Sequence, residues 1–255
     1  MNIHVVTTGL SKTKDLEALK TKAEFRKATR NMMLAWSSIE DALSTLGGIL
    51  PASTEGASTG AIVMGSGFGE LEVTRNFLSG LADSGVARPL LFQNSLHNAT
   101  LGFIAMKMAF TGPSITLSNR CFTGENCIEV AMQLLTQGQC QFCLVTGVDT
   151  LVPELTEVLN AIYSSPVALG EGAATLLLTN DDGLKILARP ALAQLHDVTY
   201  GRRAEKPAPC DFDGYYEADA IERLVLALRA AGTGTLTLEK PDGTHSSVHW
   251  SQGNA

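Results

Sequence analysis

The sequence predicts an α/β fold in which a mostly parallel or mixed sheet carries helices on both faces. The main observation is that short apolar, β-branched runs alternate with segments of helical periodicity as far as about residue 187. The second is composition, since 45% of the 255 residues are hydrophobic and 18% are charged. A chain of this length buries roughly 70% of its unfolded surface, so it needs no disulfide or metal to fold.

Five strands are expected in the sheet. Each is a short apolar run that ends at a glycine or a polar residue. They are IHVVTTG (3–9), GAIVMGSG (60–67), SITLS (114–118), QCQFCLVTGVD (139–149) and ATLLLTN (174–180).

Helices are predicted between these strands. In residues 23–46, apolar side chains recur every three, four or seven positions, as on one face of a helix. Further helices are expected over 71–83 and 122–137. The segment 96–110 is almost wholly apolar, so it is predicted to be a helix buried on most sides.

The pattern changes after residue 190, where the chain becomes polar and rich in turn residues. EADAIERLVLALRAA (217–231) predicts a helix, and TLTLEKPDGTHSSVHW (235–250) predicts a hairpin around a Pro-Asp-Gly turn. We therefore divide the chain into a domain over residues 1–189 and an extension over 190–255 that packs on the same domain.

Charge and hydropathy exclude several classes of partner. The formal net charge is −7 without a large basic cluster, which argues against nucleic acid and against an anionic membrane. No apolar run reaches 18 residues, and the first residues do not resemble a secretion signal. We expect a cytoplasmic protein with no membrane span.

No metal site or cofactor site is predicted. Cys140 and Cys143 have the spacing of a redox or zinc pair, but they lie inside a buried strand and have no second pair of ligands. His245 and His249 are four residues apart in a strand, about 13 Å, so one ion cannot bridge them. The five cysteines are an odd number and show no disulfide framework.

Other polar residues are also read as structural. The glycines of GSGFG (65–69) lack the spacing of a phosphate loop and predict a tight turn between a strand and a helix. His97 is expected to cap or pack at the start of a helix. Asp149, Glu154 and Glu157 are expected to be solvated on a turn and a helix face.

Cys121 is the candidate nucleophile. It lies directly before the helix predicted at 122–137, where free N–H groups and the helix dipole favour a thiolate and an oxyanion. Arg120 would add to this effect if its side chain points inward. A structural cysteine at a crowded strand end remains an equally good interpretation.

FQNSLHNATLGFIAMKMAFTGPSITLSNRC (92–121), QFCLVTGVD (141–149) and LGEGAATLLLTN (169–180) resemble, in this order, the N-terminal half of a β-ketoacyl synthase. That family has the thiolase fold, and the resemblance runs from about residue 3 to residue 187. It places Cys121 on the family's acyl-accepting cysteine. Phe122 stands where the family has a small residue, and the resemblance implies that Phe122 and Thr123 line the acyl tunnel.

The two histidine motifs of the family's C-terminal half, HGTGT-like and GH-x-x-GA-like, are absent. The resemblance therefore implies that the isolated chain has no base for Cys121 and does not turn over, because decarboxylation needs those histidines.

The resemblance implies a truncated synthase-like subunit that forms a heterodimer with a full-length β-ketoacyl synthase and shapes its acyl tunnel, as a chain-length factor does. The setting would be a bacterial type II system for aryl polyenes, polyketides or fatty acids, with substrates carried by acyl carrier protein. No metal, cofactor or nucleic acid is implied. The strand expected at the dimer interface comprises Ser114, Ile115, Thr116, Leu117 and Ser118. Two alternatives remain, an acyltransferase or condensing subunit that uses Cys121 and a non-catalytic homodimer that binds a ligand or acts as a scaffold.

Overall fold

A computed structural model describes residues 1–47, 60–119, 122–162, 168–202, 213–214, 219–230, 232–239 and 243–253. Its strands are β1 (Ile3–Lys12), β2 (Gly60–Gly65), β3 (Ser114–Leu117), β4 (Phe142–Asp149), β5 (Ala168–Leu169), β6 (Gly172–Asn180), β7 (Ala193–Arg202), β8 (Asp213–Gly214), β9 (Gly234–Glu239) and β10 (Thr244–Gln252). Its helices are α1 (Glu17–Lys20), α2 (Arg30–Ser44), α3 (Leu71–Ser84), α4 (Pro89–Asn94), α5 (Ala99–Lys107), α6 (Thr123–Thr136), α7 (Pro153–Ile162), α8 (Asp181–Leu187) and α9 (Asp219–Ala230), with 3-10 turns η1 (Thr13–Leu16) and η2 (Ala23–Phe25).

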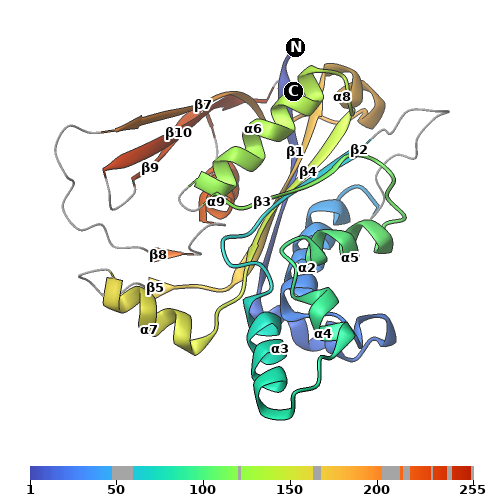
Figure 1. The fold of residues 1–255 in the computed structure, drawn as a ribbon. Helices are drawn as coiled ribbons and strands as arrows, with labels where there is room; N and C mark the ends of the chain where they lie inside the picture. Colours follow the sequence, from blue (N-terminus) through green and yellow to red (C-terminus); the bar gives the residue numbers. More distant parts are fainter. Residues whose placement is uncertain are drawn as a thin grey trace.

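One mixed sheet organises the fold, in the order β3-β2-β4-β6-β1-β7-β10-β9. The β2–β3 and β2–β4 pairs are parallel, and the other pairs in this sheet are antiparallel. Helices lie on both sides of it (Figure 1). The predicted α/β class is confirmed, and the five predicted strands are all present. The prediction of a five-stranded sheet was wrong, because three further strands join it.

The added strands come from residues 190–255. β7 pairs with β1, β10 pairs with β7, and β9 pairs with β10. The predicted hairpin is therefore the β9–β10 pair, although Pro241 and Asp242 of its turn lie outside the described residues. Ser246, Val248 and Trp250 alternate along β10 and are buried on one face, which anchors this part of the sheet to the core. The division at residue 189 remains a prediction.

A hydrophobic core lies on each face of the sheet, because successive side chains of a strand point to opposite sides. In β4, Cys143 and Val145 belong to the core that also contains residues of α6 and α9. Leu144 and Val148 belong to the core that contains residues of α2 and α5. Strands buried on both faces read as continuous apolar runs, which is why they could be predicted from sequence.

The predicted start of the first helix, at residue 23, was wrong. Residues 23–25 form the 3-10 turn η2, and α2 begins only at Arg30. The Thr29 side chain accepts a hydrogen bond from the backbone N–H of Met32 at 3.1 Å, so it caps the helix. Phe25 is still buried in the core, which explains why it fits the apolar spacing without being part of α2.

The segment predicted as one buried helix over residues 96–110 also differs. The helix is the shorter α5, and α4 precedes it, which sequence analysis did not predict. Leu101 and Ile104 of α5 are buried, whereas Met106 is 74% exposed. Only one side of α5 packs on the sheet. The prediction that the segment 96–110 is buried on most sides was therefore wrong.

Candidate functional site

The ends of the parallel strands β2 and β4 hold the candidate site. Because the two strands are parallel neighbours, their carboxyl ends meet at one edge of the sheet. There the side chain of Asp149 accepts hydrogen bonds from Ser66 Oγ at 2.8 Å, Gly67 N at 2.9 Å and Phe68 N at 3.2 Å. Asp149 is fully buried, so the prediction that it is solvated was wrong. Its carboxylate fixes the turn after β2.

The turn itself has the tight form that the glycines predict. Ser66 Oγ accepts a hydrogen bond from Gly69 N at 2.7 Å, and Gly69 has a left-handed φ of 55°. A Cβ atom on Gly69 would lie 2.7 Å from Nδ1 of His97. His97 therefore packs on the turn, in agreement with its predicted structural role, and brings the loop before α5 against it.

A hollow of about 510 Å³ opens beside this turn. It lies between the loop before α5 and the edge of the sheet at β3. The Oγ1 atom of Thr116 is buried and has no hydrogen-bond partner among the described residues. The hollow is lined by Leu96, His97, Asn98, Thr116 and Ser118.

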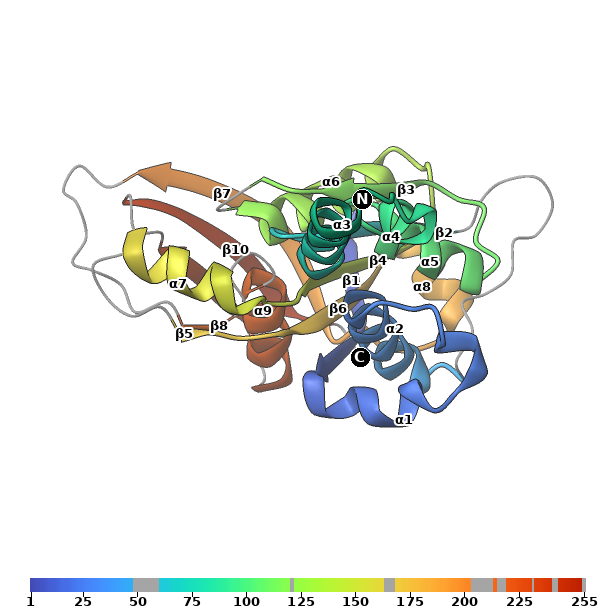
Figure 2. The same cartoon turned by 60° about the horizontal axis from the view of Figure 1, so that its bottom comes forward.

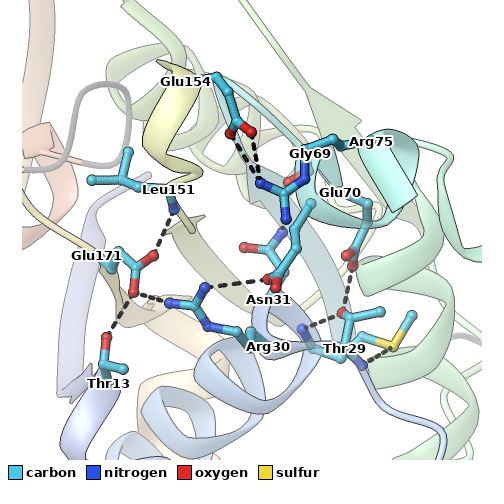
Figure 3. Close-up of polar contacts among 12 residues, drawn as sticks. Thr13, Thr29, Arg30, Asn31, Gly69, Glu70, Arg75, Leu151, Glu154 and Glu171 are labelled. Atoms are coloured by element: carbon cyan, nitrogen blue, oxygen red, sulfur yellow. Dashed lines mark hydrogen bonds and ion pairs between the residues drawn. The ribbon is translucent and has the colours of Figure 1, made fainter. Parts of the chain in front are cut away.

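A buried carboxyl group lies at the start of α3, below the same turn. One oxygen of Glu70 accepts hydrogen bonds from the hydroxyl groups of Thr29 and Thr100. Asn31 Nδ2 donates to the Gly69 carbonyl at 3.3 Å in the same cluster (Figure 3). Burial raises the pKa of Glu70 from 4.5 to about 7, which outweighs the two hydrogen bonds that favour its charged form. This carboxyl group joins the starts of α2, α3 and α5.

Charged side chains surround this cluster on the outside (Figure 3). Arg30 forms ion pairs with Glu72 at 3.2 Å and with Glu171. Glu171 also accepts hydrogen bonds from Leu151 N at 2.8 Å and from Thr13 Oγ1 at 3.0 Å. The glutamate of the LGEGAA segment thus holds the loop after β4, η1 and α2 together, which is a structural role.

The two glutamates near α7 follow their predicted exposure. Glu154 forms an ion pair with Arg75 at 2.9 Å, and its side chain is 61% exposed. Glu157 is also exposed. Neither touches the hollow or the turn in the part of the chain that the structure describes, so both remain solvated surface groups.

Cys121 and Arg120 lie outside the described residues, so the assignment of Cys121 as the acyl acceptor stays a prediction. The residues on either side of them are placed. Thr123 is buried, and its Oγ1 accepts a hydrogen bond from Asn119 N at 2.8 Å. Phe122 is packed edge-on against the ring of Tyr200, with 5.2 Å between centroids. The assignment of Phe122 and Thr123 as residues that line the acyl tunnel likewise remains a prediction.

The C-terminal strands contact the first turns of α6, which sequence reasoning missed. Tyr200 of β7 donates a hydrogen bond to Glu129 at 3.0 Å and accepts one from Asn126 at 2.8 Å. Ser246 of β10 donates to the fully buried Glu125. A tyrosine in a polar, turn-rich segment gives no sequence signal for a partner some 70 residues away. These contacts hold the helix that follows Cys121.

The strand β3 forms one end of the sheet, and β2 is the strand it pairs with in the described chain. The carbonyl groups of Pro113 and Leu117 accept hydrogen bonds from Ile62 N and Ser66 N. Because the backbone groups of a strand alternate in direction, those of Ser114 and Thr116 point to the other edge. This arrangement is compatible with the predicted interface, which remains a prediction.

Buried thiols lie in the core below the site. Cys140 and Cys143 are buried, as the core interpretation predicted. Burial raises the pKa of Cys127, which contacts the end of β2 at Gly65, so this thiol stays protonated and unreactive.

His245 and His249 are partly exposed on β10. No cluster of His, Cys, Asp or Glu side chains suited to a metal ion is found among the described residues. Within the same ranges, no helix is long and apolar enough to cross a membrane.

Comparison with known proteins gives curated relatives and many solved structures. PikAIII, a pikromycin polyketide synthase component of Streptomyces venezuelae, is 29% identical over 157 residues, which are 60% of this chain. The chain spans only 9% of the length of that protein.

The ishigamide ketosynthase/chain length factor has a TM-score of 0.81 at 14% identity and covers 99% of both chains. The ketosynthase ApeO in complex with its chain length factor ApeC, from Xenorhabdus doucetiae, has a TM-score of 0.65 at 16% identity, covering 99% of this chain and 100% of that one. Identities this low show a common fold, which here includes the C-terminal strands. The family described as β-ketoacyl synthase, N-terminal domain, matches residues 7–162, so the chain belongs to the β-ketoacyl synthase family.

Proposed function

We propose that this chain is a ketoacyl-synthase-like subunit that forms a heterodimer with a full-length β-ketoacyl synthase. In that complex it acts as a chain-length factor and shapes the acyl tunnel of its partner. The biosynthetic system is a type II pathway for polyketides, aryl polyenes or fatty acids. Substrates reach the partner on acyl carrier protein, which contacts the complex rather than this chain alone.

The single observation that carries the proposal is the position of β3 at one end of an eight-stranded sheet. At the opposite end, β7, β10 and β9 of this chain already extend the sheet. At the β3 end, a strand of a second chain can extend it. Ser114 and Thr116 direct their backbone groups to this edge, where another strand can bind them. The two structures of ketosynthase with chain length factor, which this fold matches, support a partner of the synthase family.

A bulky ring after the end of β3 supports the proposed tunnel-shaping role. Phe122 introduces a large ring there, fixed by Tyr200. The buried Asp149 and Glu70 accept hydrogen bonds from Ser66 and Thr29, and both hold the turn beside β3. In this proposal the two carboxyl groups have a structural role, and the partner carries out the chemistry.

The test is co-expression of the chain with a full-length synthase from the same genome, followed by native mass and condensation assays. A one-to-one complex whose activity survives Cys121→Ala is expected. Loss of activity in this variant, with the complex intact, would instead favour the acyltransferase alternative. A chain that forms only homodimers would contradict the heterodimer.

A further inference from the structure

The segment from the middle of α3 to the residue before His97 is exposed and apolar. We call residues 78–96 the arm. Every residue from 81 to 90 is exposed. Large hydrophobic side chains along the arm are between 37% and 61% exposed, and they are Leu78, Leu81, Val86, Leu90, Phe92 and Leu96. So many exposed apolar side chains in one short segment mark an interaction surface.

The arm is a structural unit that barely contributes to the core. Val73 is the buried residue of α3, and α4 has none. The two helices hold each other instead, since the rings of Phe77 and Phe92 pack with 5.7 Å between their centroids. Figures 1 and 2 show α3 and α4 standing together at one side of the sheet. Much of the apolar surface of α3 thus stays exposed, since Leu78 and Leu81 are 57% and 37% exposed.

The hollow joins the arm to the edge strand. Leu96, the last residue of the arm, lines it together with His97 and Asn98, and Thr116 and Ser118 line its other side. The arm and the edge of β3 therefore form one continuous surface. The buried hydroxyl group of Thr116 has no partner among the described residues, so an occupant that brings a polar group would satisfy it.

The size of the edge strand shows why more surface is needed. β3 has four residues, about 13 Å of strand. Stable complexes bury about 1,200 Å² or more in total, which a strand this short cannot supply by itself. The arm adjoins it and is poor in charge, with Asp83 and Arg88 as the charged residues between 78 and 96. An apolar, nearly neutral surface suits a lasting subunit contact and does not suit an acidic carrier protein.

We propose that the arm and the hollow are the main contact for the full-length ketoacyl synthase subunit, with the β3 edge setting the register. This inference rests on the proposed function, because it assigns the surface to the same partner. An apolar side chain of the partner with a polar end enters the hollow and binds Thr116. The arm packs on an apolar surface beside it.

The experiment measures the dissociation constant of the complex between the co-purified chains. The double variant Leu78→Ser/Leu90→Ser removes two exposed side chains of the arm. The matched control is Ile186→Ser/Leu226→Ser, which changes residues of similar exposure on α8 and α9. Thermal unfolding of each variant alone checks that it is folded.

The arm variant is expected to weaken the complex by about 100-fold, roughly tenfold for each leucine, and the control by less than about threefold. Equal binding by the arm variant and the wild-type chain would overturn the inference. The inference would also be overturned if the arm variant lost only the self-association of this chain and still bound the synthase as the wild-type chain does.

A third variant separates this inference from the proposed function. Ser114→Pro places a ring without an N–H group on the outer edge of β3. If this variant abolishes the complex while the arm variant leaves it intact, the arm assignment fails and the heterodimer stands. If the wild-type chain binds no synthase, the proposed function fails and the inference with it.

Discussion

Replacing Glu70 by glutamine should make the protein more stable, by an amount that grows as the pH rises from about 4.5 to about 7. Glu70 is buried, and its pKa is raised from 4.5 to about 7 because burial disfavours the charged carboxylate. Glutamine keeps an oxygen that can accept the hydrogen bonds of Thr29 and Thr100. The substitution therefore removes the ionisation and leaves the geometry in place.

The sign follows from proton linkage. Between about pH 4.5 and about pH 7 the folded chain retains a proton on Glu70 that the unfolded chain has lost, so the free energy of unfolding decreases as pH rises. The full difference in pKa corresponds to about 3 kcal/mol. This contribution is present below pH 4.5 and is lost by the time the pH has passed about 7.

Urea unfolding of the wild-type chain and Glu70→Gln at about pH 5 and about pH 8.5 tests this prediction. We expect the variant to be more stable than the wild-type chain by about 1 kcal/mol near pH 5 and by about 3 kcal/mol near pH 8.5. The other titrating groups are common to both chains, so their contributions cancel in the difference. A difference that stays constant with pH would refute the reasoning.

Three further substitutions test the contacts around the site, each by urea unfolding. Asp149→Ala leaves the buried donors of the turn without their acceptor, so it should lower the free energy of unfolding by about 3 kcal/mol. An unchanged unfolding midpoint would contradict this role. Tyr200→Phe removes the hydroxyl group that links β7 to α6 and should cost about 1 kcal/mol, with the ring packing retained. Gly69→Ala should cost about 2 kcal/mol from its left-handed φ plus its contact with His97. Gly85→Ala, also at positive φ but in open space, is the control and should cost less.

The sheet could be predicted from the sequence because its central strands are buried on both faces. β4 and β6 contain runs in which both alternating sets of side chains meet a core, so they are apolar throughout. The strands added by residues 190–255 were less evident. In β10, polar residues alternate with Val248 and Trp250, and this pattern identifies a strand without revealing which strand it pairs with.

The role of Asp149 could not be predicted from local pattern, because its partners lie 81 to 83 residues earlier in the chain. The sequence did contain a signal, which is an acidic residue directly after a buried strand and a glycine-rich turn directly after another. Only the parallel pairing of β2 with β4 places the two ends side by side. A pairing of that kind depends on the whole fold, and the carboxylate therefore looked like a surface group.

Periodicity also cannot distinguish a face buried in the core from a face buried by another chain. α3 and α6 were both predicted as helices, and both are 14 residues long. Yet α6 buries eight of its residues against the sheet, whereas α3 buries only Val73. Covering the apolar face of either helix stabilises the protein for the same reason, because apolar surface is removed from water. The described residues leave Leu78 and Leu81 of α3 exposed, and a second subunit that covers the arm would bury them as the sheet buries the apolar face of α6.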